Sequence, residues 1–314
     1  GVACPPGDGV HADPLMIAAI TATKNASADS ETNVSFYSAE SQRSARRRFQ
    51  LDQEIRSAIE TAQFELHYQP IVDFSRKKVV SAEDLIRWRH PERGMVSPAS
   101  FVPVAETAGL IIPLGQWILE TACRQASEWS NSLVDAPRVS INVSARQFSD
   151  PELLSTIDRA VENAGISHDR LKLEITETTL VTDLKQARQT ISALRERGIA
   201  VVLDDFGADY SNLRYIANID FDEMKDDRLF VSHVDGDERL KAICTSVLTL
   251  ANGLGIPVVA EGVERTEELR TLSWLGCRMF QGYLFSRPIP AAAFPESVRQ
   301  IMVNVADPTF AGGS

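Results

Sequence analysis

The chain has 314 residues, of which 44% are apolar and 24% charged, a globular composition that argues against disorder over most of the length. Its net charge of −11 argues against long nucleic acid as a partner, because backbone binding requires clustered lysine and arginine. No apolar run reaches the roughly 18 residues of a membrane-spanning helix. The four cysteines are scattered without a CxxC pair, which favours a reducing cytoplasm over a disulfide framework or a zinc site.

The N-terminal part differs in character from the rest. The chain begins with Gly1 rather than Met, which indicates a piece of a longer protein whose membrane attachment through other residues stays open. Residues 1–40 are small, polar and weakly periodic, whereas residues 41–62 place apolar side chains at helical spacing and predict a linker helix. The basic run Arg46–Arg48 could be a nucleic-acid patch, although such a short cluster fits a solvated helix face better.

From Phe64 onward, short apolar runs alternate with amphipathic stretches. The runs cover residues 64–74, 79–85, 139–143, 171–175, 200–203, 221–225, 256–260 and 277–280. Helical patterns cover residues 113–132, 151–165, 183–198, 238–254 and 264–275. This alternation predicts an α/β fold, a modified TIM-type (β/α)8 barrel over residues 63–305, followed by a flexible tail at 306–314. Because the segment Ser75–Lys78 is too short for a helix, the first strand is expected to be antiparallel and the barrel irregular.

Polar residues close or directly follow most of these runs. They are Glu83, Asn142, Glu174, Glu177, Asp204, Asp205, Lys225, Asp227, Glu261 and Gln281. The carboxyl ends of barrel strands meet at one mouth, where active sites lie. The sequence therefore predicts a shared site at that mouth.

Carboxylates crowded into one mouth repel each other, and divalent cations relieve that repulsion. An all-oxygen ligand set without His or Cys favours Mg²⁺ or Mn²⁺ over zinc. The adjacent Asp204 and Asp205 suit two ions, since one carboxylate can bridge both while its neighbour binds only the second. Two ions about 3.5–4 Å apart clamp the attacking and leaving oxygens of a phosphodiester. Lys225 could then orient the water or stabilise developing negative charge.

Each of these residues also has an ordinary structural interpretation. A glutamate at a strand end can be a salt-bridge partner, Asn142 can cap the following turn, and Lys225 can belong to an ion pair at the bottom of the barrel. Residues 204–207 and the pair Gln281-Gly282 can be plain turns. Taken at successive strand ends, these interpretations require many coincidences, so the shared site is preferred.

Eight motifs occur in a specific order. They are Tyr68-Gln69-Pro70-Ile71-Val72, Glu83-Asp84-Leu85-Ile86-Arg87-Trp88-Arg89-His90-Pro91, Ile141-Asn142-Val143-Ser144, Leu173-Glu174-Ile175-Thr176-Glu177, Asp204-Asp205-Phe206-Gly207, Lys225-Asp226-Asp227, Ala260-Glu261-Gly262-Val263-Glu264 and Phe280-Gln281-Gly282-Tyr283. The set resembles the EAL family of cyclic di-GMP phosphodiesterases from about Leu51 to Pro290. The resemblance implies a metal-dependent hydrolase that converts cyclic di-GMP to linear pGpG, and a homodimer formed through the region after Asp205.

The resemblance also implies a role for each site residue. The first metal ion would be held by Glu83, Asn142, Glu174 and Asp204, and the second by Asp204, Asp205 and Glu261. Lys225 and Gln281 would position the attacking water, and Glu177 would hold the loop after Asp205. The nucleotide would be bound by Gln69, Leu85, Arg87, Asp227 and Glu264, with Arg87 at a phosphate.

Residues 1–40 resemble the end of a GGDEF domain. The likeness rests on Gly1-Val2-Ala3, Pro6-Gly7-Asp8-Gly9, a helix near 13–25 and Phe36-Tyr37. It implies a parent protein of the GGDEF–EAL type with an upstream sensor region, and the alternative is a disordered leader.

Three positions depart from the EAL pattern, each toward aspartate: Asp84, Asp209 and Asp226. We expect them to add negative charge beside the site. Asp209 stands where the family has a glycine, which suggests a backbone with φ > 0 and makes the loop Phe206–Asn212 a regulatory weak point. The alternative is that Asp209 is a solvated turn residue that caps a helix.

Three classes of function fit the resemblance. The first is a working phosphodiesterase, which is favoured because every expected ligand is present. The second is a catalytically silent cyclic di-GMP receptor, although receptors of this family usually lose metal-site carboxylates or the lysine. The third, a protein-interaction scaffold, would leave Arg87 and the acidic cluster without a purpose.

Overall fold

The computed structural model describes residues 1–5, 11–26, 39–181, 183–207, 219–307 and 310. The strands are β1 Phe64–Asp73, β2 Lys78–His90, β3 Gly94–Val96, β4 Arg138–Asn142, β5 Leu171–Thr176, β6 Ala200–Phe206, β7 Glu223–Asp226, β8 Val258–Ala260, β9 Met279–Gln281 and β10 Ile289–Pro290. The helices are α1 Ala12–Ala26, α2 Ala39–Glu60, α3 Pro98–Ala108, α4 Ile111–Ser132, α5 Ala145–Phe148, α6 Leu153–Ala164, α7 Glu177–Val181, α8 Leu184–Glu196, α10 Arg228–Val231, α11 Glu238–Leu254, α12 Thr266–Trp274 and α13 Phe294–Ala306. Two short 3-10 helices, His168–Arg170 and Ala291–Ala293, complete the described elements.

Contacts divide the chain into two units. The first comprises Gly1–Ala62 and Ala99–Leu110, and it contains α1, α2 and nearly all of α3. The second comprises Gln63–Pro98 and Ile111–Ser314, and it contains every strand numbered above. In the described residues, no helix is both long enough and apolar enough to cross a membrane.

The second unit is built on a closed ring of eight strands in the order β1-β9-β8-β7-β6-β5-β4-β2, which the β1–β2 pairing closes. Neighbouring strands from β2 through β9 run parallel. Strand β1 runs antiparallel to both of its neighbours. The prediction of an irregular TIM-type barrel with a reversed first strand is therefore confirmed.

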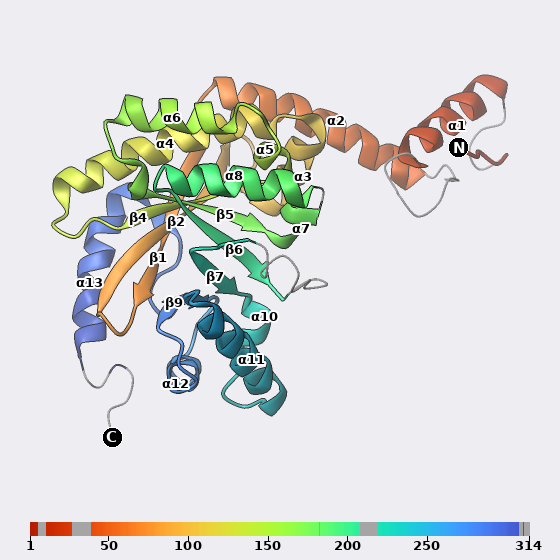
Figure 1. Ribbon diagram of the computed structural model, residues 1–314. Coiled ribbons are helices and arrows are strands. Elements are labelled where there is room, and N and C mark those ends of the chain that lie inside the picture. The colour runs from red at the N-terminus through yellow and green to blue at the C-terminus, as the bar shows by residue number, and fades with distance from the viewer. Residues whose placement is uncertain (6–10, 27–38, 182, 208–218, 308–309, 311–314) are drawn as a thin grey trace. The chain divides into compact units, whose positions relative to one another are not determined.

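Helices lie outside the ring of strands, as α4, α6 and α8 do in Figure 1. Their limits follow local signals in the sequence. The side chain of Asp237 accepts hydrogen bonds from the backbone of the first turn of α11, and that helix ends at Gly255, whose φ of 73° is readily adopted only by glycine. Asp183 caps α8 in the same way. These caps explain why the helices occur close to the positions that periodicity predicts.

Alternating side chains give the barrel wall two different faces. On the outside, Tyr68 of β1 meets Trp129 of α4 edge-on with 4.8 Å between ring centroids, and Trp129 stacks on Phe294 of α13 at 4.4 Å. This packing supplies the apolar core between strands and helices. On the inside, Lys172 of β5 and Glu223 of β7 form a buried ion pair of 2.7 Å. The barrel interior is therefore partly charged.

Candidate active site

Lys225 of β7 lies at the centre of the site and is only 1% exposed. Its ammonium nitrogen is 3.1 Å from Glu83 Oε2 and 2.8 Å from Glu174 Oε2. The same nitrogen lies 3.4 Å from Asp204 Oδ1 and 2.5 Å from Glu261 Oε1. Glu261 directly follows β8, and Glu174 and Asp204 stand within the last three residues of β5 and β6. Glu83, which the sequence analysis placed at the end of its strand, instead lies in the middle of β2, at the last position that pairs with the parallel β4. Four strands therefore deliver four acids around one amine.

Three amide side chains complete this cluster. Asn142 Nδ2 donates to Glu83 Oε1 at 2.9 Å, so Asn142 is tied to the site, and Ser144 caps the following helix instead. Gln281 Nε2 donates to Glu83 Oε2 at 2.5 Å and to Gln69 Oε1 at 3.2 Å. Gln69 lies opposite Glu83 in the β1–β2 register, which brings the reversed strand into the site.

The carboxylates of this cluster outnumber its single ammonium group. Burial and the charge of Glu83 raise the pKa of Glu174 to about 8. Burial likewise raises the pKa of Glu261 well above its usual range. Burial also opposes ionisation of Glu83, but the nearby Lys225 and its amide donors lower the pKa of Glu83 overall. One ammonium is therefore too little positive charge for the surrounding acids.

The donor set beside Lys225 fits a divalent cation. Ligand oxygens of Asp204, Asp205 and Glu261 lie within 4.8 Å of one another. Asp204 Oδ1 is buried and accepts no hydrogen bond, although Lys225 lies nearby. The β6–β7 register shifts between Leu203 and Phe206, and Asp205 has a positive φ of 53°. This irregularity re-aims two consecutive carboxylates, which would otherwise face opposite sides of the strand.

Glu177, the first residue of α7, contacts the chain directly after the acidic pair. Its Oε1 accepts a hydrogen bond from Gly207 N at 3.2 Å, at the beginning of the loop that the sequence analysis expected Glu177 to hold. Gly207 has a φ of 93°, and a Cβ there would lie 2.8 Å from the ring of Phe230. Glycine is thus required on both conformational and steric grounds.

A cavity of about 290 Å³ opens beside the cluster. Of the residues expected to bind nucleotide, Gln69, Leu85 and Glu264 line it. Arg87 is not among its lining residues, and its guanidinium donates to Ile86 O at 2.9 Å. Asp227 is not among them either, and its side chain caps α10 by accepting from Leu229 N at 2.6 Å.

Sequence reasoning missed three polar residues of the site. Arg228 and Tyr283 line the cavity, and Arg228 pairs with Glu264 at 2.8 Å. Arg228 directly follows the motif Lys225-Asp226-Asp227, and Tyr283 is the last residue of the motif Phe280-Gln281-Gly282-Tyr283, so both positions were an available signal. Ser140 donates to Glu174 from inside the barrel. Its spacing of two residues from Asn142 on β4 puts both on the inward face, which strand alternation could have revealed.

Two of the departures from the EAL pattern point away from the metal ligands. Asp84 pairs with Tyr68 on the outer face of the barrel, and burial raises its pKa well above the usual range. Burial also raises the pKa of Asp226 to about 7. The side chain of Asp226 is hydrogen-bonded to Cys244 of α11. Burial therefore opposes the negative charge that Asp84 was expected to add beside the site. Asp209 and most of its loop lie outside the described residues.

The fold is an α/β barrel in which acids, amides and one buried lysine gather at one mouth. Such an arrangement is typical of an active site that binds metal ions. The family comparison makes this specific, because the EAL domain model matches residues 52–288. The chain belongs to the EAL domain family.

Named relatives agree with this assignment. Cyclic di-GMP phosphodiesterase NbdA of Pseudomonas aeruginosa is 35% identical over 308 residues, which are 98% of this chain and 39% of that protein. The bifunctional diguanylate cyclase/cyclic di-GMP phosphodiesterase MucR of the same organism is 34% identical over 298 residues, 95% of this chain and 44% of that protein. The chain thus spans less than half the length of these curated relatives.

Solved structures share the barrel. The structure described as PaMucR phosphodiesterase in a c-di-GMP complex has a TM-score of 0.75 and 35% identity, and the match covers 78% of this chain and 99% of that chain. The EAL enzyme Bd1971 in its cAMP- and cyclic-di-GMP-bound form has a TM-score of 0.78 and 33% identity, and the match covers 81% of this chain and 70% of that chain.

Proposed function

We propose that this chain is a phosphodiesterase that hydrolyses cyclic di-GMP to linear pGpG. The observation that carries the proposal is the complete cluster around Lys225, in which Glu83, Glu174, Asp204 and Glu261 are all present and in contact with the amine. A receptor that only binds the nucleotide has no need for this set. The names of the relatives and their nucleotide complexes support the choice of substrate.

We infer that the site holds two divalent cations, Mg²⁺ or Mn²⁺. Glu83, Asn142, Glu174 and Asp204 would hold one, and Asp204, Asp205 and Glu261 the other. The Asp204 oxygen that accepts no hydrogen bond and the excess of carboxylates support this inference. Bound there, such ions would polarise the phosphodiester and lower the pKa of a water molecule.

Protein side chains would supply the remaining functions. Lys225 carries a fixed positive charge at the meeting point of the strands, where it can orient a water molecule and stabilise negative charge on a phosphate oxygen. Gln281 can hold the same water through its amide, since it already contacts Glu83. Gln69, Leu85 and Glu264 would contact the nucleotide in the cavity, and Arg87 and Asp227 are proposed to join them when it binds.

The deciding experiment is incubation with cyclic di-GMP and Mg²⁺, followed by chromatography for pGpG. Time-dependent appearance of pGpG supports the enzyme, and an Asp204→Asn variant serves as the control. Tight binding of cyclic di-GMP without turnover under both Mg²⁺ and Mn²⁺ would instead assign a receptor. Absence of both binding and turnover would contradict both functions.

We further propose a homodimer formed through the region after Asp205, which multi-angle light scattering at several concentrations would test. We also propose the domain division of residues 1–40 as a GGDEF remnant, 41–62 as a linker helix, 63–305 as the EAL barrel and 306–314 as a tail. We also propose a cytoplasmic setting, because none of the four cysteines forms a disulfide in the residues that the structure describes.

A further inference from the structure

The barrel has a second cavity at the mouth opposite the acidic cluster. Its volume is about 690 Å³, within the range of small-molecule sites and more than twice that of the cavity beside Lys225. Lining residues such as Arg138, Lys172 and Glu223 stand at or next to the beginnings of parallel strands, and Asp73 is the last residue of the reversed β1. The cavity is thus the amino-terminal mouth of the barrel.

The bottom of a TIM barrel usually serves stability alone. A charged, hollow mouth therefore requires a further explanation.

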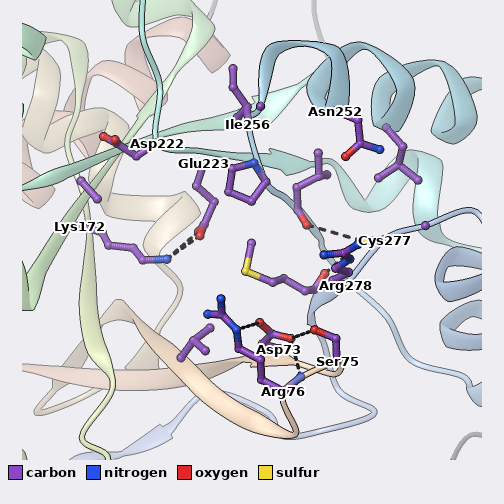
Figure 2. A pocket seen from close by; sticks show the side chains of 18 of the residues that line it. Asp73, Ser75, Arg76, Lys172, Asp222, Glu223, Asn252, Ile256, Cys277 and Arg278 are labelled. Atoms are coloured by element: carbon purple, nitrogen blue, oxygen red, sulfur yellow. Dashed lines mark hydrogen bonds and ion pairs between the residues drawn. The ribbon is translucent and has the colours of Figure 1, made fainter.

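The carboxylates that line this cavity already have partners. Asp73 accepts hydrogen bonds from Ser75 Oγ at 2.6 Å and from the backbone of Arg76 at 2.9 Å. Asp222 is held at 3.1 Å by Arg195, which does not line the cavity, and Glu223 is paired with Lys172. Figure 2 shows the Asp73 group and the Lys172–Glu223 pair facing the same space.

The cations that line the cavity are in excess. The side chains of Arg138 and Arg278 form no hydrogen bond or ion pair with any other residue that the structure describes. At the floor, the buried Lys172 ammonium donates two hydrogen bonds to Glu223, at 2.9 and 2.7 Å, and its third N–H has no acceptor among the residues that the structure describes. Arg138, Arg278 and Lys172 thus each have N–H groups that can donate to an anion in this cavity.

The remaining lining is apolar. The wall is lined by Leu248 of α11, by Met279 of β9 and by Ile256, which precedes β8. An apolar wall with a few charged groups is the usual composition of a site for a small organic ligand, because the wall binds the body and the charges orient it. Guanidinium groups match phosphate and carboxylate through paired N–H donors.

We propose that the amino-terminal mouth of the barrel is a second ligand site, which takes a small organic anion with an apolar body. Its phosphate or carboxylate group is bound by Arg138 and Arg278, with the Lys172–Glu223 pair as the polar floor. The site is separate from the acidic cluster and does not depend on the proposed hydrolysis.

The test is calorimetric titration of the full chain, treated with EDTA, at low ionic strength. The probes are phenylphosphonate and benzoate, which carry the two candidate anions on the same ring, with benzamide as an uncharged control. Saturable binding of at least one anion, absent for benzamide and weakened by salt, is expected. The tighter of the two probes identifies the anionic group that the site prefers.

Four variants locate the binding. Arg138→Ala and Arg278→Ala each remove an exposed side chain without a partner and are expected to weaken binding about five- to tenfold. Arg188→Ala removes an exposed arginine of α8 that does not line the cavity, so it should leave the affinity unchanged. Asp204→Asn should also leave it unchanged, because that residue lines the other mouth.

The proposal is overturned if neither anion binds saturably or if benzamide binds equally well. It is equally overturned if Arg188→Ala weakens binding as much as Arg138→Ala and Arg278→Ala do. A loss of binding in Asp204→Asn alone would place the anion at the acidic cluster and would also contradict the proposal.

Discussion

Glu174 of β5 and Lys225 of β7 lie 2.8 Å apart across the interior of the barrel, although strand β6 separates their strands in the sheet. Two residues earlier on the same strands, Lys172 and Glu223 form a second pair with the charges exchanged. Inward residues of alternate strands share a layer in such barrels, which explains how side chains from non-adjacent strands meet. The layer that holds the acidic cluster therefore lies next to a layer whose ion pair has the lysine and the glutamate on exchanged strands.

Removal of one partner from the lower pair should destabilise the fold. Lys172→Met leaves Glu223 as an uncompensated buried charge, and a loss of about 3–5 kcal/mol in the free energy of unfolding is expected. The double variant Lys172→Met/Glu223→Leu should recover most of that loss, because it leaves no buried charge. Urea denaturation of the parent, both single variants and the double variant gives the coupling energy between Lys172 and Glu223. Equal stability of Lys172→Met and the parent would contradict the predicted stabilisation by this ion pair.

Hydrolysis should require added metal. EDTA is expected to abolish pGpG formation, and Mg²⁺ or Mn²⁺ to restore it, because the ligands of the acidic cluster are all oxygen atoms. Ca²⁺ should bind but support little turnover, since it prefers more ligands at longer distances. Chromatographic assays with each ion in turn provide the measurement. Undiminished product in EDTA would refute the metal requirement.

Asp204→Asn and Lys225→Ala should both lose activity, but for different reasons. The first removes the carboxylate assigned to both ions and should abolish metal binding, whereas the second should leave metal binding intact. Loss of one electrostatic contact of the Lys225 kind typically lowers the rate by about 10²–10³. Metal binding measured by calorimetry beside the kinetics separates the two. Lys185→Ala, an exposed lysine of α8, is the control and should be fully active.

Metal binding that survives in Asp204→Asn would remove that residue from the ligand set. Metal sites that are empty in Lys225→Ala would show that the lysine has a structural role rather than one toward the water.

Asp226 should make stability depend on pH in the metal-free protein. Burial raises its pKa from 3.8 to about 7, so the native state binds a proton more tightly than the unfolded state does. Stability contributed by the neutral form is therefore lost as the pH rises from about 4 through about 7. Above that range the cost is on the order of 4 kcal/mol.

Asp226→Asn should be more stable than the parent, by a margin that grows over this range and then stays constant. Thermal unfolding in EDTA across the pH series measures it. The matched control is Asp220→Asn, an exposed position whose substitution should leave the pH profile unchanged. Parallel profiles for Asp226→Asn and the parent would refute the burial effect.

Glu177 should control the apparent affinity for metal through Gly207. Glu177→Ala removes the acceptor of the Gly207 N–H, and the Mg²⁺ concentration for half-maximal activity should rise about two- to tenfold. Glu177→Gln keeps an acceptor oxygen and should have a smaller effect. Activity titrations with Mg²⁺ compare them, and equal midpoints for Ala, Gln and the parent would show that the hydrogen bond has no part in assembling the site.

Much of the site could be predicted because the carboxyl ends of the parallel strands meet at one mouth of the barrel. Residues such as Glu174 and Glu261 lie far apart in the chain, yet each stands at or near the carboxyl end of a parallel strand, so the topology brings them together. The reversed β1 could be predicted from the four-residue link Ser75–Lys78, which only an antiparallel turn can span. Its role in carrying Gln69 into the site followed from the register.

Other features depend on geometry that no local pattern encodes. The expected second strand covers residues 79–85, whereas β2 continues to His90 and pairs with β3. Its charged residues Arg87 and Arg89 hide the strand signal, because long side chains tolerate an exposed strand end without apolar alternation. The Lys172–Glu223 pair was also missed, since a buried ion pair is defined only once two distant strands are placed in one layer.

The reversal of β1 determines where the polypeptide joins the barrel. In a ring of parallel strands the first strand would begin at the amino-terminal mouth. Here β1 begins at the catalytic mouth, where Gln63 O accepts a hydrogen bond from Arg89 N at 2.9 Å. Ten residues of extended chain span about 33 Å, so this one inversion shifts the attachment point by the full height of the barrel wall. The backbone that precedes β1 therefore enters the barrel at the rim of the acidic cluster rather than at the opposite rim.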